Sequence, residues 1–205
     1  MGRVEAGSQR ASRRRSRDEV QEAVRDALVQ LLRARPFKDV TVDELARTAG
    51  ISRTAFYFYY RSKNEVLMAA ADETSAEVYA EADRWWHGEG PPEQLVRAAL
   101  EGIAAVYLEH ADILRAAVEA TTYDEEFKTF YTALIQRFVT QTADHLRREL
   151  EAGRLRPLDP DPVAEALVWM AERCNHAFLL LEDRPVRDVV ESLTTIWVHA
   201  LYPDT

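Results

Sequence analysis

The fold of this chain is decided by residues 41–63, which read TVDELARTAGISRTAFYFYYRSK. The segment opens with Thr41-Val-Asp-Glu44, a capping box in which a threonine and a glutamate three residues later satisfy free backbone donors at a helix start. A short helix is therefore expected to end at Gly50, and a second one to run from Arg53 to Tyr59. Two short helices joined by a glycine-containing turn predict a helix-turn-helix; the alternative is an αα-corner within a helical bundle.

The second of these helices carries aromatic side chains on both of its faces. Phe56 and Tyr60 are at positions that face the core, which leaves Arg53, Tyr57 and Tyr59 to face outward. Exposed tyrosines are unusual on a purely structural surface, but in a major groove the hydroxyl bonds phosphate while the ring packs on a sugar or a thymine methyl. Arg53 can donate two hydrogen bonds to a guanine edge. The outward face is therefore a candidate DNA-reading surface.

Helical signals continue on both sides of this segment. Ser16 to Glu19 and Ser62 to Glu65 form two further capping boxes, and Asp161-Pro162 indicates an N-cap followed by proline at the first helical position. The expected helices outside the helix-turn-helix cover residues 16–34, 62–86, 93–108, 112–120, 124–152, 163–181 and 186–202. The sequence shows no alternation typical of a strand, so the predicted fold class is all-α.

The composition excludes several classes of protein. The single cysteine, Cys174, excludes an intramolecular disulfide and a cysteine-cluster zinc site, and it indicates a reducing, cytoplasmic environment. Cys174 itself is expected to be a buried, inert thiol rather than an oxidant sensor. The longest purely apolar run near the C-terminus, residues 177–181, is too short to cross a bilayer, so no membrane association is expected.

Charge divides the chain into a basic first third and an acidic remainder. Residues 1–67 hold 14 Lys and Arg against 9 Asp and Glu, and residues 68–205 hold 12 against 26. Six arginines fall within the first 17 residues, and residues 1–15 are expected to form a disordered arm. A basic head on an acidic body indicates that the head meets a polyanion, although a merely solvated arm explains its arginines equally well.

Two segments of the chain carry a family resemblance. The sequence AGISRTAFYFYYRSKNEVL at residues 49–67, with FKDVTVDELA at residues 37–46, resembles the signature of TetR-family transcriptional repressors. FYFY at residues 56–59, WMAER at residues 169–173 and IWVHALY at residues 196–202 resemble the ethionamide-repressor (EthR-like) branch of that family. The resemblance implies an all-helical homodimer with nine helices per subunit. Three would form a DNA-binding head and the rest a ligand-binding body, with the last two paired with their symmetry mates.

The resemblance also implies domain boundaries and DNA contacts. Residues 1–15 would be the arm, 16–62 the DNA-binding domain and 63–205 the effector-binding and dimerisation domain. The DNA contacts of the family fall on Thr41, Arg53, Thr54, Ala55, Tyr57, Tyr59 and Lys63. Thr41 would hold a phosphate at a helix N-terminus, and Lys63 would bring a positive charge to another phosphate. Tyr60 departs from the family, which usually has Phe, Val or Leu there, so its hydroxyl needs a partner or access to water.

The acidic body carries no catalytic motif. Its five histidines are scattered, and no phosphate-binding glycine loop, nucleophile elbow or zinc-protease motif is present. Glu172 and His176 stand four residues apart and could share a metal ion, but a salt bridge or a pair of cavity-lining side chains is the expected role. We therefore expect no metal, no cofactor and no enzymatic activity.

The resemblance places an apolar effector cavity within the body. Its lining would consist of Val96, Leu100, Ile103, Tyr107, Tyr131, Ile135, Phe138, Thr142, Val168, Ala171, Glu172, His176 and Trp197. The EthR-like branch presents an asparagine pair to its ligand, whereas this sequence has Val168 and Ala171 at those positions. A different effector is therefore expected. The nearest polar substitutes are Glu172, Arg173, Asn175 and His176.

Together these features predict a transcriptional repressor. It would bind a near-palindromic operator as a homodimer and release it when a small, largely apolar effector fills the cavity. Two alternatives stay open at this point: a helical carrier or enzyme that uses the cavity without binding DNA, and a structural dimer with no ligand. DNA affinity at low salt would favour the repressor. Its absence, or turnover of a substrate, would favour the carrier or enzyme, and a body without a cavity would favour the structural dimer.

Overall fold

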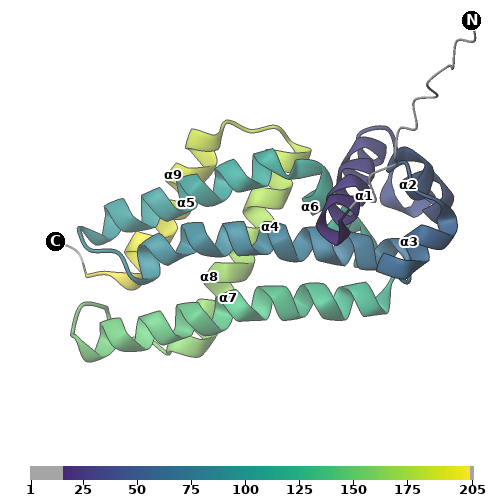
Figure 1. Ribbon diagram of the computed structural model, residues 1–205. Coiled ribbons are helices and arrows are strands. Elements are labelled where there is room, and N and C mark those ends of the chain that lie inside the picture. Colours follow the sequence, from purple (N-terminus) through teal and green to yellow (C-terminus); the bar gives the residue numbers. More distant parts are fainter. Residues whose placement is uncertain (1–15, 204–205) are drawn as a thin grey trace, which may run out of the picture.

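The computed structural model describes residues 16–203 (Figure 1). Over that range the chain forms nine α-helices, one short 3₁₀ helix and one π-helical segment, with no strand, which confirms the predicted all-α class. The predicted arm, residues 1–15, lies outside the described residues. The elements are α1 (Arg17–Leu32), η1 (Phe37–Asp39), α2 (Val42–Thr48), α3 (Arg53–Tyr59), α4 (Lys63–Trp86), α5 (Pro92–Glu109), α6 (Ala111–Ala120), α7 (Glu125–Glu151), α8 (Pro160–Cys174), η2 (Asn175–Leu181) and α9 (Val186–Leu201).

The helices α1, α2 and α3 form an N-terminal head. The capping boxes at Ser16 and Thr41 close as expected, because each side chain accepts from the backbone three residues on and the glutamate there bonds back to the cap. Gly50 joins α2 to α3 with a φ of 69°, a left-handed conformation that glycine adopts without steric cost. Phe37 and Phe56 are fully buried in the head, so the inner face of α3 is fixed by packing.

Helix α4 connects the head to the body. It begins at Lys63 beside the head and ends at Trp86 near the far end of the body (Figure 1). A second connection is made by the backbone N–H groups of Phe37 and Lys38, which lie 3.2 and 3.4 Å from the Glu119 carboxylate on α6. Both α4 and α6 thus contact the head directly.

The body places α5 and α7 against α4, with α8 against α7 and α9 against α5 (Figure 1). Large aromatic side chains meet at its centre. The Trp85 ring on α4 lies 5.0 Å from the Trp197 ring on α9 and 4.3 Å from the His145 ring on α7, measured between centroids. No helix over residues 16–203 has both the length and the apolar composition needed to span a membrane.

The third predicted capping box is only half formed. The Ser62 hydroxyl accepts from the Glu65 N–H, as expected. The Glu65 carboxylate, however, accepts from the backbone of Arg61 rather than from that of Ser62. The extended backbone at Ser62, with φ of −154°, brings the Arg61 N–H within reach of the same carboxylate.

The eighth helix differs from its expected start and end. It begins at Pro160 with Asp159 as its cap, because the Asp161 carboxylate bonds Arg147 on α7 and is not used as a cap. At Asn175 the α-helix gives way to the π-helical segment η2, which continues to Leu181. Such wide turns are rare and occur often at functional sites.

Candidate functional sites

Helix α3 presents an exposed outer face. Ser52 caps it by accepting from the Ala55 N–H at 3.1 Å. Arg53 and Thr54 are exposed, and the Tyr57 and Phe58 side chains expose 47% and 89% of their surface. The other two predicted DNA contacts on this helix are less open, because Ala55 and Tyr59 are partly buried and the Tyr59 ring packs against the core.

Arg53 is held in a defined position on this face. Its guanidinium lies 2.9 and 3.0 Å from the two carboxylate oxygens of Asp43 on α2, and 3.5 Å from the Tyr57 hydroxyl. Both partners stabilise the charged form, so the hydrogen bond to Tyr57 and the charge of Asp43 raise the pKa of Arg53. To reach a base edge, Arg53 must exchange Asp43 for the new acceptor.

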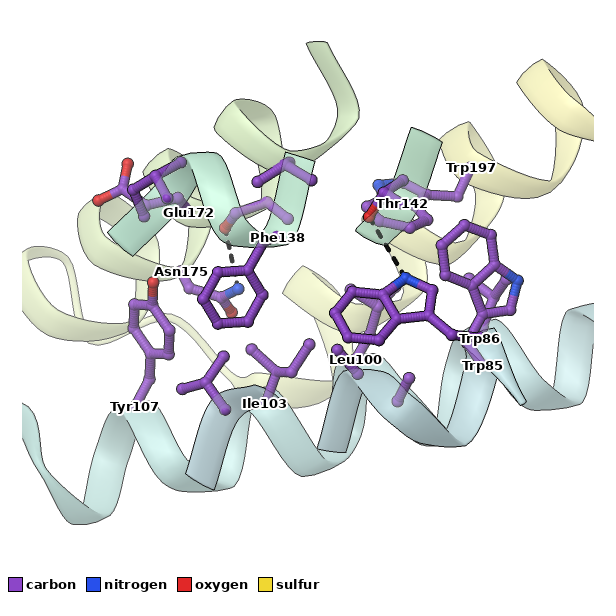
Figure 2. Close-up of a pocket in the computed structure, with 17 residues that line it drawn as sticks. Trp85, Trp86, Leu100, Ile103, Tyr107, Phe138, Thr142, Glu172, Asn175 and Trp197 are labelled. Carbon is purple, nitrogen blue, oxygen red and sulfur yellow. Dashed lines mark hydrogen bonds between the residues drawn. The ribbon is translucent and has the colours of Figure 1, made fainter. Parts of the chain in front are cut away.

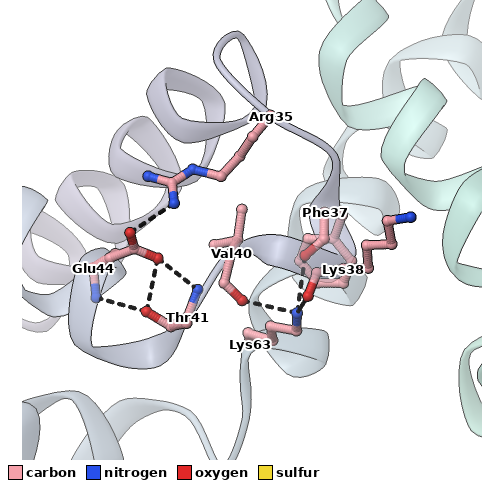
Figure 3. A network of polar contacts seen from close by, with 7 residues as sticks. All are labelled: Arg35, Phe37, Lys38, Val40, Thr41, Glu44 and Lys63. Atoms are coloured by element: carbon pink, nitrogen blue, oxygen red, sulfur yellow. Dashed lines mark hydrogen bonds and ion pairs between the residues drawn. The ribbon is translucent and has the colours of Figure 1, made fainter.

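Thr41 and Glu44 form a closed polar network at the start of α2 (Figure 3). The Thr41 hydroxyl donates to the Glu44 carboxylate at 2.8 Å and accepts from the Glu44 N–H. The same carboxylate pairs with Arg35 at 2.7 Å, and the Thr41 and Arg35 bonds lower the pKa of Glu44. The hydroxyl predicted to hold a phosphate is thus already bonded within the head.

Lys63 is bonded inward rather than standing free. Its Nζ donates to the carbonyl oxygens of Phe37, Lys38 and Val40 at 2.9, 2.8 and 2.8 Å (Figure 3). It also lies 4.7 Å from the centroid of the Phe37 ring. These bonds use all three ammonium hydrogens, and partial burial lowers the pKa of Lys63. Lys63 therefore closes the C-terminal end of η1, and a phosphate contact would replace one of these bonds.

The departure at Tyr60 is explained by its surroundings. The ring is buried against Phe56, with 5.8 Å between centroids, and burial raises the pKa of its hydroxyl, although the nearby Gln21 side chain on α1 lowers it in part. Gln21 is thus the polar neighbour of this hydroxyl.

An apolar cavity lies in the centre of the body (Figure 2). The cavity itself holds about 80 Å³, and the space between the lining side chains comes to about 640 Å³ when open solvent is included. The lining residues are Val78, Ala82, Trp85, Trp86, Val96, Ala99, Leu100, Ile103, Tyr107, Ile135, Phe138, Thr142, Val168, Ala171, Glu172, Asn175 and Trp197. A cavity lined in this way, mostly by apolar side chains, suits a small, mostly hydrophobic molecule.

Two of the predicted lining residues lie outside this cavity. Tyr131 lines a smaller neighbouring pocket, and its hydroxyl donates to Glu172 at 2.7 Å. His176 is buried but does not line the cavity; its pKa is lowered mainly by burial and also by the charges of Arg173 and Arg115.

Most polar groups of the lining are paired within the protein. The Trp86 N–H donates to the Thr142 hydroxyl at 3.3 Å (Figure 2), and the Trp85 N–H donates to the Tyr202 hydroxyl at 3.0 Å. Burial raises the pKa of Glu172 although the Tyr131 hydroxyl stabilises its charged form. Burial likewise raises the pKa of Tyr107.

Family comparisons match both parts of the chain. Residues 24–70 match the model of bacterial regulatory proteins of the tetR family, and residues 96–203 match the C-terminal domain of the transcriptional regulator EthR. The sequence is 32% identical to the HTH-type transcriptional regulator EthR of Mycolicibacterium smegmatis, over 94% of this chain and 91% of the relative. This chain belongs to the TetR family of transcriptional regulators. EthR of Mycobacterium tuberculosis is 31% identical to this TetR-family regulator over 94% of this chain and 92% of the relative.

Solved structures share the fold of this TetR-family regulator. NalD of Pseudomonas aeruginosa, described as the secondary repressor of the MexAB-OprM multidrug efflux pump, superposes with a TM-score of 0.74 at 17% identity, covering 93% of this chain and 100% of NalD. The fatty acid degradation regulator FadR of Bacillus halodurans gives a TM-score of 0.74 at 13% identity, covering 86% and 93%. The chain is thus EthR-like in sequence, with a ligand-binding C-terminal domain, and TetR-like in fold.

Sequence reasoning missed several features of these sites. Phe58 is the most open aromatic on α3, although its place between two tyrosines of the recognition helix was a usable signal. The predicted lining also left out the contribution of α4, which includes Trp85 and Trp86. Asn175, the first residue of η2, also lines the cavity. No sequence pattern predicted that η2 would be π-helical.

One group of residues could chelate a cation at the surface. The ligand atoms of Glu77, Glu109 and His110 lie within 4.8 Å of one another, and the His110 ring nitrogen is 2.9 Å from the Glu77 carboxylate. Both glutamates are exposed, and such acidic groups are common without an ion. Glu172 and His176, four residues apart on the chain, do not belong to this group.

Proposed function

We propose that this TetR-family regulator is a repressor that binds a near-palindromic operator as a homodimer and is released by a small, largely apolar effector. One observation carries the proposal. Helix α4 begins at Lys63, which is bonded into the DNA-binding head, and its later turns supply Val78, Ala82, Trp85 and Trp86 to the cavity wall. A molecule in the cavity thus touches the same rigid element that positions the head.

The outer face of α3 is proposed to read the operator. Arg53 would exchange Asp43 for a guanine edge, while Tyr57 and the neighbouring Phe58 pack on sugars and thymine methyls. Thr54, Ala55 and Tyr59 lie on the same short helix and are proposed to add contacts to the DNA backbone. Thr41 and Lys63 would approach phosphates only by giving up a bond that each makes within the head.

Dimerisation is proposed to occur through η2 and α9, at the end of the chain. Leu181 and Ile196, which lie on these elements, expose large apolar side chains. Covering such side chains is the driving force of most homodimer interfaces. A two-fold dimer presents two α3 helices to successive major grooves, which is why the operator should be near-palindromic.

Release by the effector is proposed to be a population shift. The effector would favour the arrangement of α4 and α6 in which the two heads no longer match the half-sites. The coupling equals the difference in effector affinity between the two arrangements, typically about 1–3 kcal/mol. A regulator of this kind acts where bacterial DNA is, in the cytoplasm, and needs no cofactor or metal ion for this mechanism.

In-vitro selection from random DNA duplexes tests the DNA-reading part. The expected result is a consensus of two inverted half-sites, and the Arg53→Ala variant should lose base preference at one position in each half-site. A consensus without inverted symmetry would contradict the dimer. Failure to enrich any sequence at low salt would contradict the repressor itself and favour a helical carrier.

A further inference from the structure

Three buried polar atoms of the cavity-lining residues have no hydrogen-bond partner among residues 16–203: Glu172 Oε2, Asn175 Oδ1 and the Trp197 indole nitrogen. Asn175 exposes only 1% of its surface, and its Oδ1 makes no hydrogen bond. Trp197 is also buried, and its indole N–H donates to nothing. Buried polar groups are nearly always hydrogen-bonded, because an unpaired one has lost its water without compensation. Glu172 Oε2 has the charge of Arg173 beside it, so the two atoms that point to a ligand are Asn175 Oδ1 and the Trp197 N–H.

The orientation of the Asn175 amide is fixed by its own helix. Its Nδ2 donates to the carbonyl oxygen of Ala171 at 2.9 Å. A flipped amide would place two oxygens against each other there, so the assignment of oxygen and nitrogen follows from this contact. Oδ1 is consequently the atom left for the cavity. It is an acceptor, and a ligand group that pairs with it must carry an N–H or an O–H.

Glu172 does not fill this role. Its Oε1 accepts from the Tyr131 hydroxyl at 2.7 Å, and its Oε2 lies 3.4 Å from the guanidinium of Arg173. Figure 2 shows the Glu172 carboxyl pointing away from Phe138, whereas Asn175 lies beside Tyr107 at that end of the cavity. The cavity thus offers the neutral amide oxygen of Asn175 at this end, beside the Tyr107 hydroxyl.

We infer that the effector is an elongated, largely apolar molecule with a terminal hydrogen-bond donor, which Asn175 Oδ1 accepts, and an acceptor group for the Trp197 N–H. Figure 2 places Asn175 at the Tyr107 end of the cavity and Trp197 at the Trp85 end, with Leu100 between them. The inference rests on the proposed function only in naming the ligand an effector, because binding to the cavity is measured without DNA.

Two isomeric probes test the donor directly. Decanol and methyl nonyl ether have the same formula, but only decanol has an O–H. Quenching of tryptophan fluorescence reports their binding, because Trp85, Trp86 and Trp197 line the cavity. The full-length protein should bind decanol roughly five- to tenfold more tightly than the ether. The Asn175→Leu variant should keep its affinity for the ether and lose the preference for decanol.

A third isomer keeps the test independent of the variant. An alcohol with its hydroxyl at mid-chain should bind the native protein no better than the ether, because its donor falls among apolar side chains. Equal affinity for decanol and the ether, no binding of any isomer, or a decanol preference that persists in Asn175→Leu overturns the inference. Operator binding, measured on the same protein without a probe, reports separately on the proposed function.

Discussion

Lys63 offers a decisive test of how the head is built. In the structure its ammonium group joins three carbonyl oxygens, those of Phe37, Lys38 and Val40, whereas the family resemblance assigns it to a DNA phosphate. The substitution Lys63→Met keeps the length of the side chain and removes the three donors. If these internal bonds are the main role of Lys63, the variant should lose stability of the fold. Its loss of DNA affinity should then follow from that lower stability rather than from a missing phosphate contact.

The expected loss can be worked from the three bonds. The bonds to Phe37 and Val40 are partly buried, so removing the ammonium leaves two carbonyls short of a partner at about 1–1.5 kcal/mol each. The bond to Lys38 is exposed, and water replaces it. The total is about 2–3 kcal/mol. For a chain of this length each kcal/mol lowers Tm by about 2–4 °C, so the variant should melt about 4–12 °C below the native protein.

Thermal unfolding followed by circular dichroism measures this shift. Lys38→Met is the matched control, since it makes the same charge change in the head and the Lys38 side chain bonds no described residue. The control should melt within about 2 °C of the native protein. A Lys63→Met protein that melts like the native one, while the salt slope of its DNA binding falls by about 0.9, would refute this reasoning and show a phosphate contact.

Three further predictions concern the reading face, the link between head and body, and a buried histidine. Arg53→Ala should weaken binding to the specific operator by about 1–3 kcal/mol in a competition titration, and an equal loss on non-specific DNA would argue against a base contact. Glu119→Ala should speed hydrogen exchange of the Phe37 amide roughly tenfold, because that N–H loses its acceptor; unchanged exchange would mean that the head–body bond is not made in solution. Burial lowers the pKa of His145, so below about pH 6.5 the unfolded chain takes up a proton that the folded chain refuses, and stability falls. In urea unfolding between pH 6.5 and 5, the His145→Asn variant should lose less free energy of unfolding than the native protein, by up to about 1.4 kcal/mol per pH unit. If the pH dependence of the unfolding free energy is the same in both proteins, groups other than His145 cause it.

The boundaries of the head were predictable because local chemistry sets them. The expected limits of the recognition helix, Arg53 to Tyr59, agree with those of α3, since Ser52 caps its start and Tyr60 turns extended at its end. The closed box at Thr41 shows the same local control. The box at Ser62 failed to close because a neighbouring backbone N–H competes for the same carboxylate, which depends on the bend before α4.

The cavity was predictable in outline but not in its polar details. Apolar positions such as Leu100 and Phe138 line it as the resemblance implied. Whether Asn175 or His176 faces the cavity depends on how η2 packs against its neighbours, and sequence spacing does not resolve two adjacent residues. The bonds of Lys63 could not be predicted either. Its three acceptors are backbone carbonyl oxygens that only the fold around η1 brings together, and backbone groups leave no pattern in the sequence.

The central claim is that this TetR-family regulator reads a specific DNA site with α3. A salt-dependent binding titration on the intergenic DNA upstream of its own gene, against scrambled DNA of the same length, tests this claim most directly. We expect a preference for the upstream DNA of at least about a thousandfold, together with a steep loss of affinity as salt rises. Equal affinity for the two DNAs across the salt range, with Arg53→Ala binding both as the native protein does, would contradict it.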